Sequence, residues 1–298
     1  PLQGFLPLRL LGAVHARVLA GEAPELARHY PTVGGTAEWP GVGEAFLGVL
    51  EAQADALRPQ LERFPQTNEV RRCAGLLPGF LEIERRHPGC TLRLREIGSS
   101  AGLNLFWDRY AYTLGQHRWG QPASGVQLDT EWEGGAAAFD RKPTVESRAG
   151  CDIAPVRIHE PAEIHRLESY IWADQPERLE RMRAAVAIAK SEPFRLDTAR
   201  AGEWLPVELA APPAGIARVV FHSSVWLYIP AEERAEIVGT LEDLGAKASA
   251  ETPLAWLRHE DDDDRPGRMQ LRLRLWPGGE DELLADGHPH GRFVHWRP

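Results

Sequence analysis

The stretch best suited to chemistry is GSSAG, residues 98–102, which lies between LRLREI and LNLFWDRY. Its pattern, G-x-S-x-G, is that of a hydrolase nucleophile elbow, in which Ser100 would be the nucleophile. A glycine-rich turn after a strand is also suited to holding a ligand, because its backbone can approach the ligand and the next helix presents free N–H groups. The other polar residues of the chain must decide between these two interpretations.

The hydrolase interpretation requires an oxyanion hole, an acid and a histidine in the chain order Ser, Asp or Glu, His. His288 and His290 stand late enough in the chain to follow Ser100 in that order. However, the turn follows the first convincing strand, and no HGGG-like segment precedes it. The sequence therefore favours a ligand-binding turn, and the serine hydrolase is kept as an alternative.

A ligand-binding turn predicts polar residues at the ends of later strands, where they would meet the same ligand. RAGCDIAP places Asp152 at the end of a short apolar strand, where a carboxylate can accept hydrogen bonds from ribose hydroxyls. FRLDTA places Asp197 after the next strand, and ARVVFHSSVWLYIP places His222 and Ser223 after the one that follows. These positions predict one site, with GSSAG as its floor.

Two side chains of the stretch FHSSVWLYIP are candidates for work on a substrate. His222 is the candidate for proton transfer, because an imidazole titrates near neutral pH. The alternative for His222 is a buried histidine that is hydrogen-bonded to backbone at a strand end. Tyr228 would line a substrate pocket or pack under the following helix.

The segment TNEVRR, residues 67–72, is more polar than a helix cap requires. Asn68 and Arg72 are four residues apart and would project near one face of a helix end, where they would serve as a lid over the ligand. The alternative is a helix cap at Thr67 or Asn68 together with surface ion pairs.

Two later motifs resemble metal-binding patterns, but neither predicts a metal site. In GHPHG, His288 and His290 flank a proline without an evident third ligand, so they would point into the ligand site or form an exposed turn. The run EDDDD at 260–264 is predicted to be a solvated loop, because neighbouring carboxylates of an extended chain point in different directions.

The chain around these motifs changes its hydrophobic pattern near residue 90. Residues 1–90 have a helical period, in PLRLLGAVHARVLAGE, in EAFLGVLEAQADALRPQLERF with a break near Pro59, and in TNEVRRCAGLLPGFLEIERRH. From TLRLREI onward, strand-like segments alternate with helical ones, which indicates a mainly parallel sheet with helices on both faces. The predicted strands are 92–97, 147–152, 194–197, 217–222, 253–258, 269–276 and 292–297.

Two parts of this α/β region depart from simple alternation. The last two strands flank GHPHG without a helix and are predicted to pair in antiparallel fashion. Residues 104–147 are rich in Gly, Trp and Tyr and are predicted to form an insertion after the first strand. Trp107, Trp119 and Trp132 within it would build an aromatic pocket or pack in the core.

Composition limits the classes of partner. The 298 residues, 43% of them apolar, suffice for one large domain with or without an extension. The net charge of −9 argues against a general nucleic-acid or membrane-surface binder, because both partners are polyanionic. Three distant cysteines without CxxC spacing indicate reduced thiols in a cytoplasmic protein. No apolar run approaches the roughly 18 residues of a membrane-spanning helix, and the first residues lack the pattern of a signal peptide.

Together these motifs resemble class I S-adenosylmethionine-dependent methyltransferases. The resemblance lies in Glu-x-Gly-x-x-x-Gly at 96–102, Gly-x-Asp-x-x-Pro at 150–155, an Asp after the third strand and a final β-hairpin. More narrowly, the chain resembles a bacterial family of unknown function, number 2332 in the series of such families, that is placed in that superfamily. The stretches that carry this resemblance are QTNEVRRCAGLLPGF, LREIGSSAGLNLFWDRYAY, WADQPERLERMRAA, FHSSVWLYIP and GHPHG.

The resemblance implies an α/β fold of the Rossmann-like methyltransferase type. It implies a mostly parallel sheet of about seven strands with a C-terminal antiparallel hairpin. Residues 1–90 would be a helical cap or lid, and residues 91–298 would be the methyltransferase-like domain with the insertion at 104–147. Because Asp152 follows Glu96 by 56 residues, where a compact β-α-β unit uses about 20, the insertion is expected to loop out of the sheet.

The resemblance also implies roles for single residues toward S-adenosylmethionine. Glu96 would orient the methionine end of the cofactor, Asp152 would bind the ribose diol, and Asp197 would lie near the adenine. His222 and Ser223 would approach the sulfonium. The implied cofactor-binding residues are Glu96, Gly98, Ser99, Ser100, Gly102, Asn104, Asp152, Ile153, Asp197 and His222; the catalytic candidates are His222, Ser223 and Tyr228; and the substrate or lid candidates are Asn68, Arg72, His288 and His290.

The expected function is therefore methyl transfer from S-adenosylmethionine to a small-molecule acceptor. Two alternatives remain open. One is a non-catalytic protein that binds a nucleoside or nucleotide on the same scaffold, and the other is a serine hydrolase that uses Ser100. Neither nucleic acid nor a membrane is expected as a partner.

Overall fold

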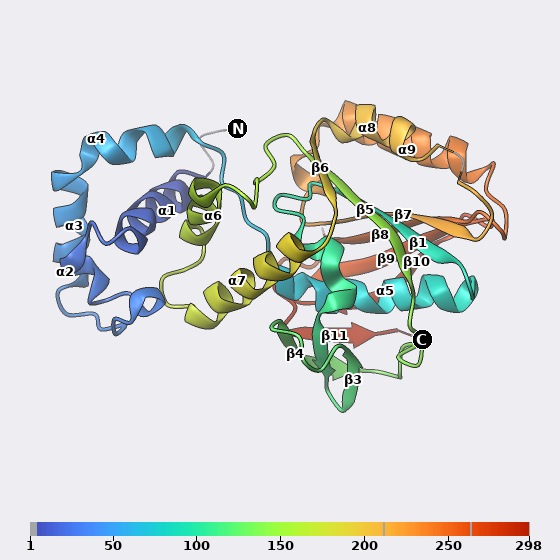
Figure 1. Cartoon of the computed structure of the whole chain (residues 1–298), viewed down its shortest axis with the longest axis horizontal. Coiled ribbons are helices and arrows are strands. Elements are labelled where there is room, and N and C mark those ends of the chain that lie inside the picture. The colour runs from blue at the N-terminus through green and yellow to red at the C-terminus, as the bar shows by residue number, and fades with distance from the viewer. Residues whose placement is uncertain (1–4, 211, 263, 298) are drawn as a thin grey trace. The chain divides into compact units, whose positions relative to one another are not determined.

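The computed structural model describes residues 5–210, 212–262 and 264–297, and the chain divides into two compact units (Figure 1). Unit 1 comprises Pro1–Asn68 and Val156–Val186, and unit 2 comprises Glu69–Pro155 and Ala187–Pro298. Residues 69–90, which the sequence pattern groups with the N-terminal helices, therefore fold with unit 2.

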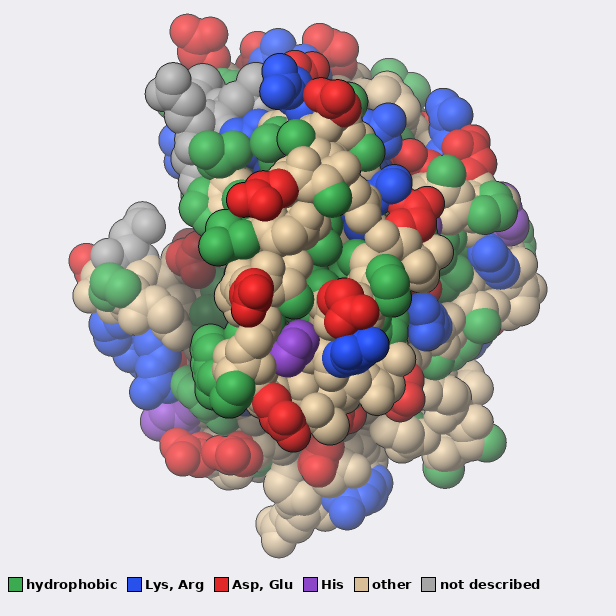
Figure 2. All heavy atoms as spheres, turned by 90° about the vertical axis from the view of Figure 1, so that its left-hand side faces the viewer, with side chains coloured by type: hydrophobic (Ala, Val, Ile, Leu, Met, Phe, Trp, Pro, Cys, Tyr) green, Lys and Arg blue, Asp and Glu red, His purple; other side chains and the backbone are tan. Residues whose placement is uncertain are grey.

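Unit 1 is helical, and the apolar face of its first helix lies in its core. Val14 in that helix packs in one cluster with Leu26 and Leu57. The predicted first helix is confirmed. The predicted second helix changes to a 3-10 helix near Pro59 as expected, but it is also interrupted at Gln53, between α3 and α4. Figure 2 views the molecule from the side of α2 to α4 and shows hydrophobic side chains exposed beside acidic ones. The elements of unit 1 are α1 (Leu6–Leu19), α2 (Pro24–Ala27), η2 (Pro31–Val33), α3 (Val42–Ala52), α4 (Ala54–Leu57), η3 (Arg58–Glu62), α6 (Pro161–Ser169) and the first part of α7 (Pro176–Ser191).

Unit 2 is built on one mixed sheet. In the described part of the chain this sheet has 11 strands in the order β3-β2-β4-β11-β10-β9-β8-β7-β1-β5-β6, and six of its ten neighbouring pairs are parallel. The strands are β1 (Thr91–Ile97), β2 (Ala111–Leu114), β3 (His117–Gly120), β4 (Gln127–Glu133), β5 (Val145–Asp152), β6 (Arg195–Thr198), β7 (Ile216–Ser223), β8 (Leu254–Asp261), β9 (Met269–Trp276), β10 (Asp281–Gly287) and β11 (Phe293–Trp296).

Helices cover both faces of this sheet, as Figure 1 shows. On one face α8 (Ala201–Glu208) and α9 (Ala231–Gly245) pack in a cluster that includes Val220 and Trp256. On the other face α5 (Cys73–Arg86) lies against β8 to β11. The helix approaches β8 closely because it carries Gly79, where a Cβ would lie 2.3 Å from Leu257 Cδ1.

The prediction that the last two strands pair with each other is wrong. The strand β10 lies between β9 and β11 and is antiparallel to both. Its sequence, DELLADG, was not recognised as a strand because its register shifts between Leu283 and Ala285, which breaks the alternation of buried and exposed positions. The C-terminal antiparallel hairpin exists, but it consists of β10 and β11.

The predicted insertion at 104–147 does not loop out of the sheet. It contributes β2, β3 and β4, and β4 joins the sheet through parallel pairing with β11. These three strands, together with β10, raise the strand number above the predicted seven. Parallel pairing between strands so distant along the chain leaves no local sequence signal, because no turn connects them.

The helix cap predicted at Thr67 or Asn68 lies instead at Glu69. Its side-chain Oε1 accepts a hydrogen bond from the backbone N–H of Arg71 at 3.0 Å, and this begins the short helix η4 (Val70–Arg72) that leads into α5. A glutamate two residues before a free N–H can satisfy it as an aspartate cap does. In the described ranges, no helix is long and apolar enough to cross a membrane.

Candidate functional site

The turn GSSAG follows β1 and has an unusual backbone. Gly98, Ser100 and Gly102 have positive φ angles of 65°, 52° and 71°. A Cβ at Gly98 would also lie 2.3 Å from Val225 Cγ2, so only glycine fits there. Ser100 adopts the left-handed conformation without being glycine, which costs roughly 1–2 kcal/mol. Backbone strain of this kind concentrates at functional sites.

Asp152, the last residue of the neighbouring strand β5, is hydrogen-bonded to the turn. Its Oδ2 accepts a hydrogen bond from Ser100 N at 3.0 Å, and its Oδ1 accepts one from Ala154 N at 2.8 Å. Ser99 N, two residues after the end of β1, donates to Cys151 O at 3.1 Å. The sequence thus correctly brings GSSAG and Asp152 together, because parallel neighbours end at the same edge of a sheet.

Glu96 lies under the turn and is 2% exposed. One oxygen bonds Asn104, whereas Oε2 has no hydrogen-bond partner among the described residues. Burial raises the pKa of Glu96 well above its ordinary value; the charge of Asp152 raises it further, and Arg72 lowers it. Ser100 Oγ is likewise buried without a hydrogen-bond partner in the part of the chain that is described.

Strand alternation divides the polar residues of this edge between the two faces of the sheet. Glu96 is paired in register with Phe221, whose ring contacts Phe80 of α5 at 5.2 Å, so Glu96 lies on the face that α5 covers. His222 follows Phe221 and therefore points to the opposite face. Ser223 returns to the face of Glu96, where it is paired in register with His259.

His222 is fully buried, and both of its ring nitrogens are engaged. Trp256 Nε1, which can only donate, lies 3.0 Å from His222 Nε2, so this nitrogen must be the acceptor and Nδ1 carries the proton. Nδ1 donates to Glu260 Oε1 at 2.6 Å, and the ring stacks on Trp226 with centroids 5.0 Å apart. This is the arrangement of a buried structural histidine, but its partners are the side chains of Glu260 and Trp256 and not the backbone groups of the alternative given in the sequence analysis.

Glu260 is a residue that the sequence motifs did not single out. Its carboxylate also accepts the backbone N–H groups of Val225 and Trp226 at 3.2 Å, at the start of η6 (Trp226–Tyr228). The prediction of a solvated loop for EDDDD is wrong at its start, because β8 continues to Asp261 and the Glu260 side chain is largely buried. The strand-like alternation of LAWLRHED was the sequence signal that could have extended the predicted strand to Glu260. Asp263 lies outside the described residues.

Arg72 lies among the polar groups on the α5 face. Its Nε donates to Pro289 O in the GHPHG turn at 3.2 Å. Its positive charge lowers the pKa of Glu96 and of Tyr228, both of which burial raises. Burial lowers the pKa of His259 to about 3, with Arg72 contributing, and in the described part of the chain His259 Nδ1 has no hydrogen-bond partner. Tyr228 is 47% exposed, at the end of η6.

The remaining predicted residues are His288, His290, Ile153 and Asn68. His288 Nδ1 accepts a hydrogen bond from His290 N at 2.9 Å, and burial lowers the pKa of His288. Ile153 is 68% exposed beside Asp152. Asn68 is the last residue of unit 1. Across the described ranges, no group of three or more His, Cys, Asp or Glu side chains is arranged to hold a metal ion.

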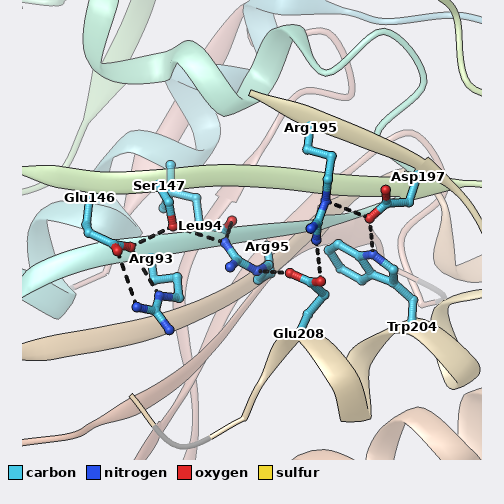
Figure 3. Close-up of polar contacts among 9 residues, drawn as sticks. All are labelled: Arg93, Leu94, Arg95, Glu146, Ser147, Arg195, Asp197, Trp204 and Glu208. Carbon is cyan, nitrogen blue, oxygen red and sulfur yellow. Dashed lines mark hydrogen bonds and ion pairs between the residues drawn. The ribbon is translucent and has the colours of Figure 1, made fainter. Parts of the chain in front are cut away.

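Asp197 belongs to a network of ion pairs on the face that α8 covers (Figure 3). Its Oδ2 accepts a hydrogen bond from Trp204 Nε1 at 2.7 Å and pairs with Arg195 Nε at 3.0 Å. Arg195 also pairs with Glu208, which pairs with Arg95 Nε at 2.8 Å. The carboxylate of Asp197 is therefore positioned by α8 and β6 before any ligand is considered.

Comparison with known proteins identifies a family. A family model described as "Uncharacterized protein conserved in bacteria (DUF2332)" matches residues 1–296. No curated protein and no solved structure matches the chain. The match covers almost the whole chain, including GSSAG, Asp152 and the GHPHG turn. The chain therefore belongs to the bacterial family DUF2332.

Proposed function

We propose that this protein is an S-adenosylmethionine-dependent methyltransferase that acts on a small molecule. The observation that carries the proposal is a pair of carboxylates around a strained glycine turn. Glu96 and Asp152 lie at the ends of the adjacent strands β1 and β5, and Glu96 Oε2 is buried without a hydrogen-bond partner in the described ranges. This acidic, incompletely satisfied site favours a ligand that is cationic and rich in hydrogen-bond donors.

The strand order supports a doubly wound scaffold for such a ligand. The parallel strands β6-β5-β1-β7-β8 follow the order 3-2-1-4-5 along the chain, which is the order of Rossmann-like sheets. The connections leave β1 in opposite directions, and ligands of such sheets bind outside the carboxyl ends of the strands at that point. The turn GSSAG lies at this position. We propose the Rossmann-like methyltransferase arrangement for these five strands alone, because β9, β10 and β11 form an antiparallel series.

The unsatisfied atoms of the site fit the chemistry of S-adenosylmethionine. An unsatisfied buried polar group costs about 1–3 kcal/mol, and Glu96 Oε2 and Ser100 Oγ are two such groups. The ammonium and sulfonium of the cofactor supply donors and positive charge. Glu96 would hold the methionine end with Asn104, while Asp152 would accept the ribose hydroxyls beside the exposed Ile153.

Bound S-adenosylmethionine supplies the activated methyl group, so the protein supplies binding and orientation. Gly98, Ser99 and Gly102 would let the backbone approach the cofactor, and Asp197 would lie toward the adenine. On the acceptor side we assign Tyr228, which is half exposed, and Ser223, which shares the sheet face of Glu96. We assign His222 the role of a positioning residue, because its hydrogen bond to Glu260 orients the N–H groups at the start of η6.

The contacts of Glu96, Asp152 and Ser100 favour the nucleotide-binding and serine hydrolase alternatives less than the methyltransferase. A nucleotide would bring phosphates to Glu96 and Asp152, and the like charges would repel, so a nucleoside is the better ligand for a purely binding protein. A serine hydrolase would need a base bonded to Ser100 Oγ, and within the described ranges this oxygen has no hydrogen-bond partner and is buried. If a fluorophosphonate reacted with the wild-type protein but not with Ser100→Ala, the result would favour the serine hydrolase over the methyltransferase.

The proposal is tested by calorimetric titration with S-adenosylmethionine and S-adenosylhomocysteine. We expect saturable binding in the micromolar range, weakened at least about tenfold by Glu96→Gln and by Asp152→Asn. Asp243→Asn, on the exposed side of α9, is the matched control and should bind as the wild type does. Failure of the wild-type protein to bind at about 1 mM ligand would refute the methyltransferase proposal. Binding without methylation of any acceptor in a screen with labelled cofactor would favour the binding protein.

A further inference from the structure

The segment 104–147 forms a groove in unit 2 that the proposed function does not use. The groove has a volume of about 690 Å³ and lies along β2 and the edge strand β3. A volume in this range is typical of sites for small molecules. Its lining residues come from the end of η5 (Leu103–Arg109), from β2, β3 and the start of β4, from the turn after β3 and from 139–143. None of these lining residues belongs to GSSAG.

Trp119 provides a fixed aromatic surface in this groove. Its ring is the outermost of a stack in which Trp107 lies between Trp119 and Phe80, with centroids 5.6 Å and 4.3 Å apart. The two inner rings are fully buried, whereas Trp119 is partly exposed. Tyr112, directly opposite on β2, contacts the Trp119 ring edge-on at 5.7 Å, and Trp119 Nε1 donates to Arg141 O at 2.9 Å. The indole is therefore held in place before a ligand arrives, which lowers the entropy cost of binding.

Two cationic side chains of the groove, Arg118 and Lys142, have no carboxylate partner among the residues that the structure describes. Arg109, which also lines it, is paired with Glu192 and Asp108, so its charge is balanced. Arg118 donates only to backbone carbonyls, and Lys142 has no hydrogen bond or ion pair within the described residues. The chain as a whole has a net charge of −9. The two positive charges of Arg118 and Lys142 beside an aromatic ring therefore form a local site that favours an anionic ligand.

We propose that this groove binds a small planar aromatic molecule that carries an anionic group, a carboxylate or a phosphate. The ring of the ligand stacks on Trp119 as the next member of the Phe80–Trp107–Trp119 series, and Arg118 and Lys142 neutralise the anionic group. The site is separate from the carboxylate site at GSSAG, so it exists whether or not S-adenosylmethionine binds.

The test is calorimetric titration of the full chain with three probes of one ring size: 2-naphthoate, 1-naphthyl phosphate and the neutral 2-naphthalenemethanol. We expect at least one anion to bind saturably, about tenfold or more tightly than the neutral probe. Whether the carboxylate or the phosphate binds better distinguishes the two anionic groups. Absence of saturable binding by both anions at about 1 mM overturns the proposal.

Variants separate the aromatic and the ionic contributions. The exposed double variant Arg118→Gln/Lys142→Gln should remove the preference for anions, whereas Lys190→Gln/Lys247→Gln, which removes the other two lysines of the chain, should keep it. Trp119→Leu should weaken all three probes about tenfold, and circular dichroism reports whether it folds. An anion preference that survives in Arg118→Gln/Lys142→Gln refutes the assignment, whatever Trp119→Leu does.

Discussion

The two faces of the sheet differ at the edge where β1, β7 and β8 end. On the α8–α9 face, His222, Glu260 and Trp256 satisfy one another's hydrogen bonds. On the α5 face, Glu96 Oε2 and His259 Nδ1 are buried without hydrogen-bond partners in the described part of the chain. Residues adjacent in sequence thus lie in environments of opposite character. We infer that the cluster of satisfied hydrogen bonds supports the fold, whereas the buried groups without partners mark the place for a ligand.

The greatest loss of stability is expected from a substitution in the hydrogen-bonded cluster of His222, Glu260 and Trp256. His222→Leu leaves the Trp256 N–H without its acceptor and removes one of the donors to the buried Glu260 carboxylate, so we expect the free energy of unfolding to fall by about 2–4 kcal/mol. The matched change on the other face, His259→Leu, removes an imidazole that lacks one hydrogen bond and should cost less than about 1 kcal/mol. Urea unfolding of both variants measures the contrast, and equal losses would remove the distinction between the faces.

The next prediction concerns the turn GSSAG, which follows β1. Gly98→Ala places a Cβ against Val225 at a positive φ, and we expect a loss of about 2 kcal/mol in the free energy of unfolding together with weaker cofactor binding. Gly239→Ala is the control, because nothing lies within 4 Å of a Cβ at this position in α9, and it should stabilise by up to about 1 kcal/mol. Unchanged binding by Gly98→Ala would show that the turn does not contact the ligand.

The unsatisfied face predicts a pH dependence. Burial, and then the charge of Asp152, keep Glu96 protonated in the folded protein above the ordinary pKa of 4.5. Its contribution to stability is therefore present below pH 4.5 and is lost as the pH rises through the elevated folded pKa. A cationic ligand favours the ionised form, so binding releases a proton below that elevated pKa.

We accordingly expect the affinity for S-adenosylmethionine to increase as the pH rises toward the elevated folded pKa of Glu96, by at most about tenfold per pH unit. Titration in two buffers of different ionisation enthalpy measures the released proton. Glu96→Gln should bind more weakly and without this release. A release of the same size in Glu96→Gln would assign the proton to another group.

A smaller change is expected in the ion-pair network of Figure 3, on the face that α8 covers. The Arg195 side chain is 53% exposed, so solvent screens its pairs with Asp197 and Glu208. We expect Arg195→Gln to change the free energy of unfolding by less than about 1 kcal/mol and to leave cofactor affinity within about twofold. A larger loss of affinity with unchanged stability would mean that Asp197 contacts the ligand through its orientation by Arg195.

Sequence reasoning succeeded where local pattern and strand order were sufficient. The alternation in TLRLREI located β1, and the rule that parallel strands end at one edge brought Asp152 to GSSAG. It could not assign the face of His222, because a one-residue difference in register moves a side chain to the other side of a sheet. Glu260 was missed because its role depends on a partner 38 residues away. The bulge in β10 and the β4–β11 pair have no local signal either.

The pairing of β4 with β11 has a consequence for the order in which the protein is made. In the strand order, β2, β3 and β4 reach the rest of the sheet only through β11, and Phe293 follows its partner Glu131 by 162 residues. At about 5–20 residues per second, the ribosome needs on the order of 10 to 30 s to supply that partner. During this time β4 has an open edge, which invites pairing with other chains. The groove lined by Trp119 lies within this late-joining segment, so its final form waits until β11 has emerged.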